Sequence, residues 1–188
     1  MVSKQSLPQI PSFSPSVRDQ QGSWASSADL VLWQDGSAIN PNEINRFEVT
    51  EVYAHPQAEV DIVLVHGLNG HPQHTWTAKN GIFWPTALLP VTFSSKDPNK
   101  SAKVRILVYG YNADVVAFAE KSASHDRIHE HAQSLVSSLA LERKSEEAEE
   151  NPIIWVAHSL GGILVKRVSD TNTSSPHNFI KAYASLRH

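Results

Sequence analysis

The sequence predicts an α/β domain with a mostly parallel sheet and flanking helices. Three nearly continuous apolar runs, rich in β-branched residues and bounded by turn residues, are typical of strands covered on both faces. They occupy residues 61–67, 103–111 and 152–159. Helix patterns separate them, a short one over 83–90 and a longer one over 125–144. Because a helix between two strands makes a crossover connection, we expect the strands to run parallel.

Local periodicity predicts the other elements. Short runs at 29–33 and 47–55 indicate outer strands. A period of two puts four residues of the second run on one face, namely Phe47, Val49, Glu51 and Tyr53. The longer helix repeats its apolar residues at a 3.6-residue spacing, at Ile128, Ala132, Leu135, Val136 and Leu139. We expect a solvated loop at 145–150 and a further helix directly after Ser159.

Length and composition favour one domain and exclude several classes of protein. The chain has 188 residues, of which 40% are apolar, enough for a single core. Residues 1–23 are rich in Ser, Pro and Gln without a helix or strand period, so we expect a disordered tail before a domain over 24–188. A net charge of -3 and scattered Lys and Arg residues argue against nucleic-acid binding.

The cellular setting is constrained mainly by what the sequence lacks. There is no cysteine, so no disulfide framework is expected, and a reducing compartment is compatible. The N-terminus has no apolar block of the secretory type. Every apolar run is shorter than the roughly 18 residues that a membrane-spanning helix needs. We therefore expect an intracellular, non-secreted protein without a transmembrane segment.

The stretch WVAHSLGG, residues 155–162, predicts a nucleophilic serine. Ser159 ends a buried strand and precedes small residues and an apolar helix, which is the strand-turn-helix setting of a nucleophile elbow. Such a turn is tight, so the residues two positions to either side must be small. Ala157 and Gly161 meet this need, although alanine replaces the glycine usual at the first position. A chance match in the turn of another α/β protein is the alternative.

A second motif supplies the hydrogen-bond donors that acyl transfer requires. HGLNGH, residues 66–71, follows the first buried strand, where a backbone N–H can face the developing oxyanion. The predicted donors are the amide of Leu68 and the amide of Leu160, which follows the serine. On its own, this motif would be an ordinary glycine-rich loop. Paired with Ser159, it predicts an oxyanion hole.

Four segments in the same order resemble a known family. DIVLVHGLNGHPQHTWT, FWPTALLP, RILVYGYNADV and WVAHSLGGILVK are similar to the lipase-like α/β-hydrolase domain of the serine-active-site-containing protein family, including its fungal members. The resemblance implies a partial α/β-hydrolase fold and a Ser-His-Asp triad that hydrolyses esters, with lipids as the expected substrates. It implies Ser159 as nucleophile, Leu68 and Leu160 at the oxyanion positions, and peripheral association with mitochondria or endoplasmic reticulum as an alternative to the cytoplasm.

The triad partners of Ser159 are not evident downstream. In α/β-hydrolases an acid and then a histidine follow the serine on later strands. Here the serine is followed by one helix, which Asp170 is expected to close, and by a polar tail without a recognisable strand. His177 and His188 in that tail lack the setting of a catalytic base. We hypothesise that the sequence is the N-terminal portion of a longer hydrolase, with an exposed apolar edge at its last strand.

The remaining histidines receive other interpretations. His66 is expected to support the oxyanion loop and His158 to pack locally. His71 and His74 lie near the expected cleft and are weak candidates for a substitute base.

His125 and His129 share a helix face but lack a third ligand, so we predict no metal. No cofactor is predicted, and a plain nucleotide-binding α/β domain is disfavoured because both nucleotide-binding glycine motifs are absent. Trp76, Trp84 and Trp155 are expected to be core or cleft aromatics.

Two functions remain open. The first is a serine ester hydrolase of the esterase or lipase type, whose activity in this chain alone would be weak or absent because a serine without its base is a poor nucleophile. The second is a catalytically inactive hydrolase-like module used for interaction or signalling. A triad Asp and His downstream of Ser159 would distinguish the hydrolase from the inactive module.

Overall fold

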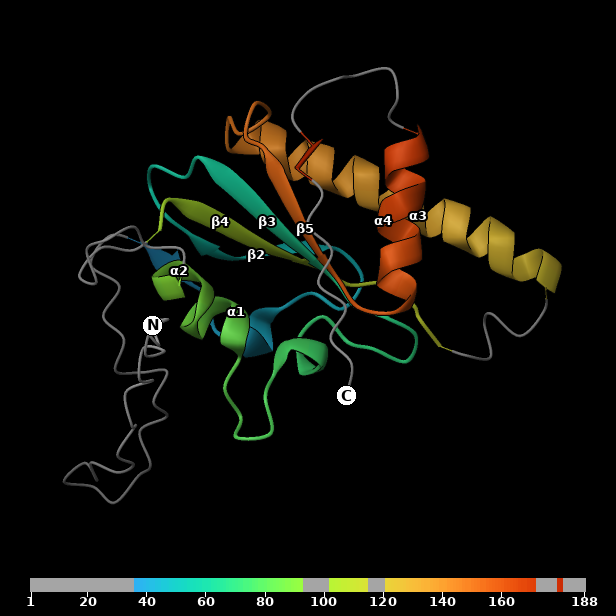
Figure 1. Cartoon of the computed structure of the whole chain (residues 1–188), viewed down its shortest axis with the longest axis horizontal. Helices are drawn as coiled ribbons and strands as arrows, with labels where there is room; N and C mark the ends of the chain where they lie inside the picture. Colours follow the sequence, from blue (N-terminus) through green and yellow to red (C-terminus); the bar gives the residue numbers. More distant parts are fainter. Residues whose placement is uncertain (1–35, 93–101, 115–120, 172–178, 181–188) are drawn as a thin grey trace, which may run out of the picture. The chain divides into compact units, whose positions relative to one another are not determined.

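The computed structural model describes residues 36–92, 102–114, 121–171 and 179–180 (Figure 1). All of them belong to the larger of two compact units, Trp33–His188. The predicted disordered tail at 1–23 and the predicted strand at 29–33 lie outside the described residues.

The described strands form one mixed sheet. They are β1 (Ser37–Ala38), β2 (Val49–Ala54), β3 (Val60–Val65), β4 (Val104–Tyr109), β5 (Ile153–Ala157) and β6 (Phe179–Ile180). Their order in the sheet is β1-β2-β4-β3-β5-β6. The neighbours β4–β3, β3–β5 and β5–β6 pair in parallel, whereas β2 is antiparallel to both β1 and β4. The α/β class and the mostly parallel sheet expected from the sequence are therefore confirmed.

The predicted alternation of β2 is wrong beyond Glu51. Glu51 pairs with Leu107 and Tyr53 pairs with Ile106, so Val52 is an extra residue in a β-bulge. The bulge turns Tyr53 to the same face as Val52, away from the face on which Val49 packs. A period of two cannot reveal an inserted residue, because the shift depends on the partner strand.

The prediction that no strand follows the serine turn is also wrong. Phe179 and Ile180 form β6, which pairs with Ile153 and Ile154 of β5. Two apolar residues in a polar tail are too short a run for periodicity to detect. The edge of β5 that was expected to be open is therefore covered at its first two residues.

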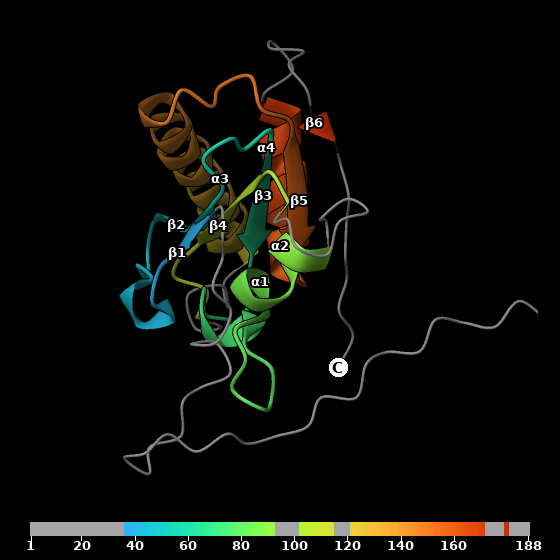
Figure 2. The same ribbon diagram turned by 90° about the vertical axis from the view of Figure 1, so that its left-hand side faces the viewer.

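Helices lie on both faces of the sheet (Figure 2). The longer ones are α3 (Lys121–Ser145) and α4 (Leu160–Thr171), close to their predicted places. The single helix predicted at 83–90 is instead two short turns, α1 (Trp84–Ala87) and α2 (Leu89–Thr92). Pro90 explains the break, because it has no N–H to donate to the carbonyl four residues earlier. Two 3₁₀ turns, η2 (Pro41–Glu43) and η3 (His74–Trp76), complete the described elements.

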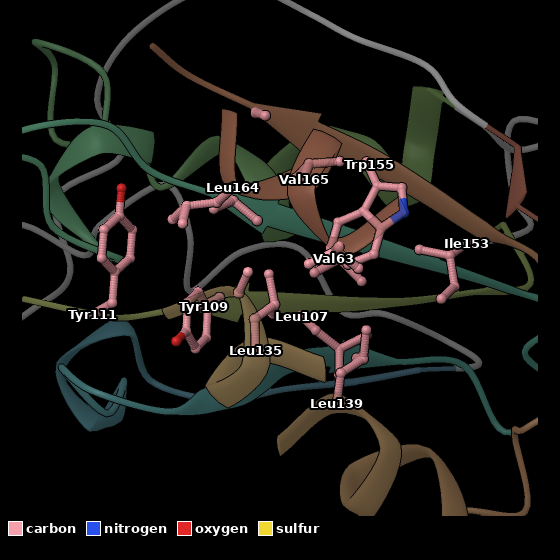
Figure 3. Packing of buried hydrophobic residues seen from close by; sticks show 14 of the residues in the cluster. Val63, Leu107, Tyr109, Tyr111, Leu135, Leu139, Ile153, Trp155, Leu164 and Val165 are labelled. Carbon is pink, nitrogen blue, oxygen red and sulfur yellow. The ribbon is translucent and has the colours of Figure 1, made fainter. Parts of the chain in front are cut away.

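One apolar cluster joins the sheet to α3 and α4 (Figure 3). It confirms the predicted helical face, since Ala132, Leu135 and Leu139 are buried in it and Ile128 and Val136 pack at its border. Its other buried members are Val63, Val65, Leu107, Tyr109, Tyr111, Ala113, Ile153, Trp155, Ala157, Leu164, Val165 and Val168. The cluster includes residues of both β5 and α4, so it packs the start of α4 against the end of β5.

A second cluster covers the opposite face. Trp76 is fully buried there and meets Trp84 edge to face, with ring centroids 5.7 Å apart. The buried members are Val52, Tyr53, Ile62, Leu64, Trp76, Phe83, Ala102, Val104, Ile106 and Val108. Trp76 and Trp155 are thus core residues. No helix among the described residues is long and apolar enough to cross a bilayer.

Buried charges hold together the starting ends of β3 and β4. Arg105 donates from Nε to Asp61 Oδ1 at 3.1 Å and from Nη2 to Asp61 Oδ2 at 2.9 Å. Arg143 from α3 approaches the same carboxylate at 3.4 Å, and Glu51 lies 3.7 Å from Arg105. Burial raises the pKa of Glu51, an effect that Arg105 partly offsets. Asp61 is fully buried, so its two guanidinium partners must compensate its charge.

We predict that Asp61→Asn lowers the free energy of unfolding by about 3 to 5 kcal/mol, because it leaves two buried guanidinium groups without their anion. Glu59→Gln is the control, since the Glu59–Lys103 pair at 2.8 Å is exposed and should contribute less than about 1 kcal/mol. Urea denaturation of both variants measures the difference. Equal losses would show that burial does not determine the strength of these pairs.

Candidate active site

Ser159 lies in a strained turn between β5 and α4. Its φ is 51°, in the left-handed region that costs a non-glycine residue about 1 to 3 kcal/mol. The residue is exposed, and no described group hydrogen-bonds its hydroxyl. Three backbone bonds hold the turn: the His158 N–H donates to the Val65 carbonyl at 3.0 Å, the Gly161 N–H to the His158 carbonyl at 2.9 Å, and the Gly162 N–H to the Ser159 carbonyl at 3.0 Å. The backbone thus presents the hydroxyl to solvent at the end of the sheet.

The first turn of α4 packs directly onto the end of β3. A Cβ placed at Gly161 would collide with the carbonyl oxygen of Val65 and lie 2.5 Å from that of His66. At Gly162 a Cβ would meet nothing within 4 Å. On the other side of the serine, Ala157 is buried in the core at 5% exposure. The predicted need for small residues around Ser159 therefore has a direct steric cause at 161.

The loop after β3 lies against the serine turn. A Cβ at Gly67 would lie 2.7 Å from the Ser159 Cβ, so the two segments touch. The loop is closed by the Gly70 N–H, which donates to the Gly67 carbonyl at 2.9 Å. The Asn69 N–H donates to the Ala113 carbonyl at 2.8 Å, beyond the end of β4. Asn69 itself has a φ of 53°, which an asparagine tolerates in tight turns.

The two predicted oxyanion residues flank this contact. Leu68 follows Gly67 in the chain, and Leu160 follows Ser159 as the first residue of α4. An N–H at a helix start has no partner within the helix, and the helix dipole makes that end attractive to anions. Within the described part of the chain, neither amide donates to another group. Ser159, Leu68 and Leu160 therefore lie at one end of the sheet, while their chemical roles stay predictions.

His66 is enclosed in the loop and does not face the serine as a base. It is fully buried, and its Nδ1 lies 3.0 Å from the Gly67 carbonyl oxygen. Burial lowers its pKa to about 4, so the ring is neutral at physiological pH. This geometry agrees with the support role expected from the sequence.

No contact links the substitute-base candidates to Ser159 in the described residues. His71 and His74 stack on each other with ring centroids 4.3 Å apart. The Gln73 N–H donates to Nδ1 of His71 at 3.1 Å, and burial followed by the charge of His74 lowers the pKa of His71. His158 is half-buried in the turn itself.

The remaining candidates from the sequence contribute little to the described site. His177 and His188 lie outside the described residues, and Asp170 falls in the last turn of α4. The side chain of His125 is also outside them. The described residues contain no group of three or more His, Asp or Glu side chains that could hold a metal ion.

One residue that contacts the loop was not predicted from the sequence. Tyr111, just beyond β4, stacks on His66 with ring centroids 4.3 Å apart and an interplanar angle of 11°. The available signal was the period of two that puts Tyr109 and Tyr111 on one face. That pattern says nothing about which loop the second ring meets, because the contact joins residues 45 positions apart.

We predict that Gly161→Ala lowers the free energy of unfolding by more than about 2 kcal/mol, since its methyl group must displace backbone carbonyls. Gly162→Ala is the matched control and should be neutral or stabilising by up to about 1 kcal/mol, because alanine favours a helix and open space is available. Thermal and urea unfolding compare the two. A Gly161→Ala protein as stable as its neighbour variant would contradict the close approach.

We also predict that acid destabilises the fold through His66. Its pKa is about 4 in the folded protein and about 6.5 when unfolded, so the unfolded chain binds the proton first as pH falls. The contribution to stability is complete above pH 6.5 and is lost toward pH 4, with a total of about 3 kcal/mol.

His66→Asn should therefore flatten the dependence of the unfolding free energy on pH between 6.5 and 4. Burial also lowers the pKa of His71 and His131, so a smaller slope of the same sign should remain. Urea denaturation at a series of pH values measures the slope. An unchanged slope would assign the acid sensitivity to other groups.

Comparison with known proteins gives one partial match. No protein family matches the chain, and no solved structure matches it. The chain is similar to Protein SERAC1 of Danio rerio, with 31% identity over 139 residues. The match covers 61% of this chain and 19% of SERAC1, so the chain spans about a fifth of that relative's length. The likeness supports a distant relationship to SERAC1.

Proposed function

We propose that this chain carries the nucleophile and the oxyanion hole of a serine ester hydrolase. The observation that carries the proposal is the left-handed φ of 51° at the exposed Ser159, between a buried parallel strand and a helix. Serine gains nothing structural from that conformation, and glycine would adopt it without strain. Strained positions of this kind cluster at active sites, and a nucleophile elbow needs one.

The two unengaged amides support the same proposal. Attack of the Ser159 oxygen on an ester carbonyl places negative charge on the carbonyl oxygen. The N–H groups of Leu68 and Leu160 would stabilise that charge, each by about 3 kcal/mol when preorganised. Gly67 brings the loop into contact with Ser159, which is the proximity that a shared oxyanion site requires.

The reaction also needs a base that receives the serine proton. In the first step the Ser159 oxygen bonds to the acyl carbon, the ester C–O bond breaks, and the proton passes through the base to the leaving alcohol. Water then hydrolyses the acyl-serine by the reverse route. We propose that a triad His and Asp beyond the described site supply this base, as in a longer α/β-hydrolase of which residues 24–188 form the N-terminal portion.

The substrate class and setting rest on resemblance. The mixed sheet, the serine after β5 and the partial likeness to SERAC1 support an α/β-hydrolase domain of the lipase-like type. Esters, with lipids as the preferred class, are therefore the proposed substrates. Peripheral association with a mitochondrial or endoplasmic reticulum membrane is part of the same proposal, with a cytoplasmic location as its alternative.

Two observations favour the alternative of a catalytically inactive interaction module. Among the described residues, the Ser159 hydroxyl has no hydrogen-bond partner, and the His66 ring is engaged within the loop. A serine without a base remains a neutral alcohol, which reacts slowly.

Labelling with a fluorophosphonate probe tests the proposed function. We expect wild-type protein to be labelled slowly, because the oxyanion hole alone assists a serine that has no base among the described residues, and Ser159→Ala to be unlabelled, because the phosphonate bonds covalently to the nucleophilic oxygen. Ser137→Ala, at an exposed serine of α3, is the control and should label like wild type. A wild-type protein that stays unlabelled would support the inactive module, and labelling that persists in Ser159→Ala would remove Ser159 as the nucleophile.

A further inference from the structure

Tyr111 contacts His66 in three separate ways. Its ring stacks on the imidazole, its hydroxyl donates to the His66 carbonyl at 2.9 Å, and its backbone N–H donates to His66 Nε2 at 3.4 Å. Tyr111 is only 4% exposed, and burial raises the pKa of its hydroxyl, so the hydroxyl remains a donor. These contacts leave His66 little freedom to rotate.

The contacts also determine which ring nitrogen of His66 carries the proton. Because Nε2 accepts from Tyr111, the proton of the neutral ring lies on Nδ1. Nδ1 then donates to the Gly67 carbonyl at 3.0 Å. The imidazole therefore connects the backbone of Tyr111 to the carbonyl of Gly67.

The Gly67 carbonyl belongs to the same peptide unit as the Leu68 N–H. The unit is planar and trans, so its carbonyl and its N–H point in opposite directions. The carbonyl accepts from both His66 Nδ1 and the Gly70 N–H, inside the loop. The Leu68 N–H is consequently directed out of the loop, where no described group receives it.

We propose that Tyr111 is a positioning residue that, through His66, holds the Leu68 amide in its anion-binding orientation. A rotated peptide would place a carbonyl oxygen where the oxyanion forms, and the partial negative charge of that oxygen would repel the oxyanion. Tyr111 does this without touching the substrate. The inference concerns the orientation of the peptide, and its catalytic consequence rests on the proposed function.

The surroundings of Tyr111 offer a closely matched comparison. Tyr109 lies on the same face two residues earlier, with its ring 5.6 Å from that of Tyr111 (Figure 3). It is 1% exposed, and its hydroxyl donates to the His131 carbonyl in α3 at 3.1 Å. Removing the Tyr111 hydroxyl deletes a bond to the oxyanion loop, whereas removing the Tyr109 hydroxyl deletes only bonds to α3, namely to the His131 carbonyl and to Ser134.

The test compares Tyr111→Phe with Tyr109→Phe by two measurements. The first is hydrogen exchange of the Gly70 amide, which reports the bond to the Gly67 carbonyl and needs no catalysis. We expect exchange to become about fivefold to tenfold faster in Tyr111→Phe, the factor of one net hydrogen bond, and to stay unchanged in Tyr109→Phe. Equal acceleration in both variants, or none in Tyr111→Phe, would overturn the inference.

The second measurement is the rate of fluorophosphonate labelling at Ser159, separated into probe affinity and bond formation. In Tyr111→Phe we expect bond formation to slow about fivefold to tenfold with probe affinity unchanged, since only the developing charge senses the amide. Tyr109→Phe should match wild type. If wild-type Ser159 does not react at all, the proposed function fails, and the exchange experiment still decides whether Tyr111 orients the peptide.

Discussion

The candidate site depends on how closely the carboxyl ends of β3 and β5 approach each other. Val65 pairs with Ala157, so both strands end at the same level and both chains turn there. Gly67 and Gly161 lie at the two points where the turns touch, and neither position has room for a Cβ. The left-handed conformation of Ser159 persists because packing on both sides leaves the turn no relaxed alternative.

A buried ion pair holds β3 to β4 at the other end of β3. Asp61 and Arg105 are register neighbours on β3 and β4, and their side chains form a bidentate pair in the protein interior. A slip of one residue would move one of these charges to the other face, among apolar side chains. The ion pair therefore specifies the register of β3 with β4, and the two glycines permit the close contact between the ends of β3 and β5.

The site combines backbone donors with a neutral imidazole. His66 can accept from Tyr111 and donate to Gly67 at the same time only while it is uncharged, because a protonated ring has no acceptor. Burial keeps it in that state by lowering its pKa to about 4. The proposed oxyanion donors are then amides held by the fold, with the start of α4 adding the positive end of its dipole.

The sequence alone determined the α/β class, the places of the main strands and helices, and the location of Ser159, Leu68 and Leu160 in the turns after the strands, because buried runs, helical spacing and turn glycines are local signals. It could not reveal the bulge at Val52 or the strand at 179–180, since each depends on hydrogen bonds to a partner strand. The Tyr111–His66 contact and the Asp61–Arg105 pair were likewise decided by the tertiary structure. They join residues about 45 positions apart, and only the parallel pairing of β3 with β4 brings those residues together.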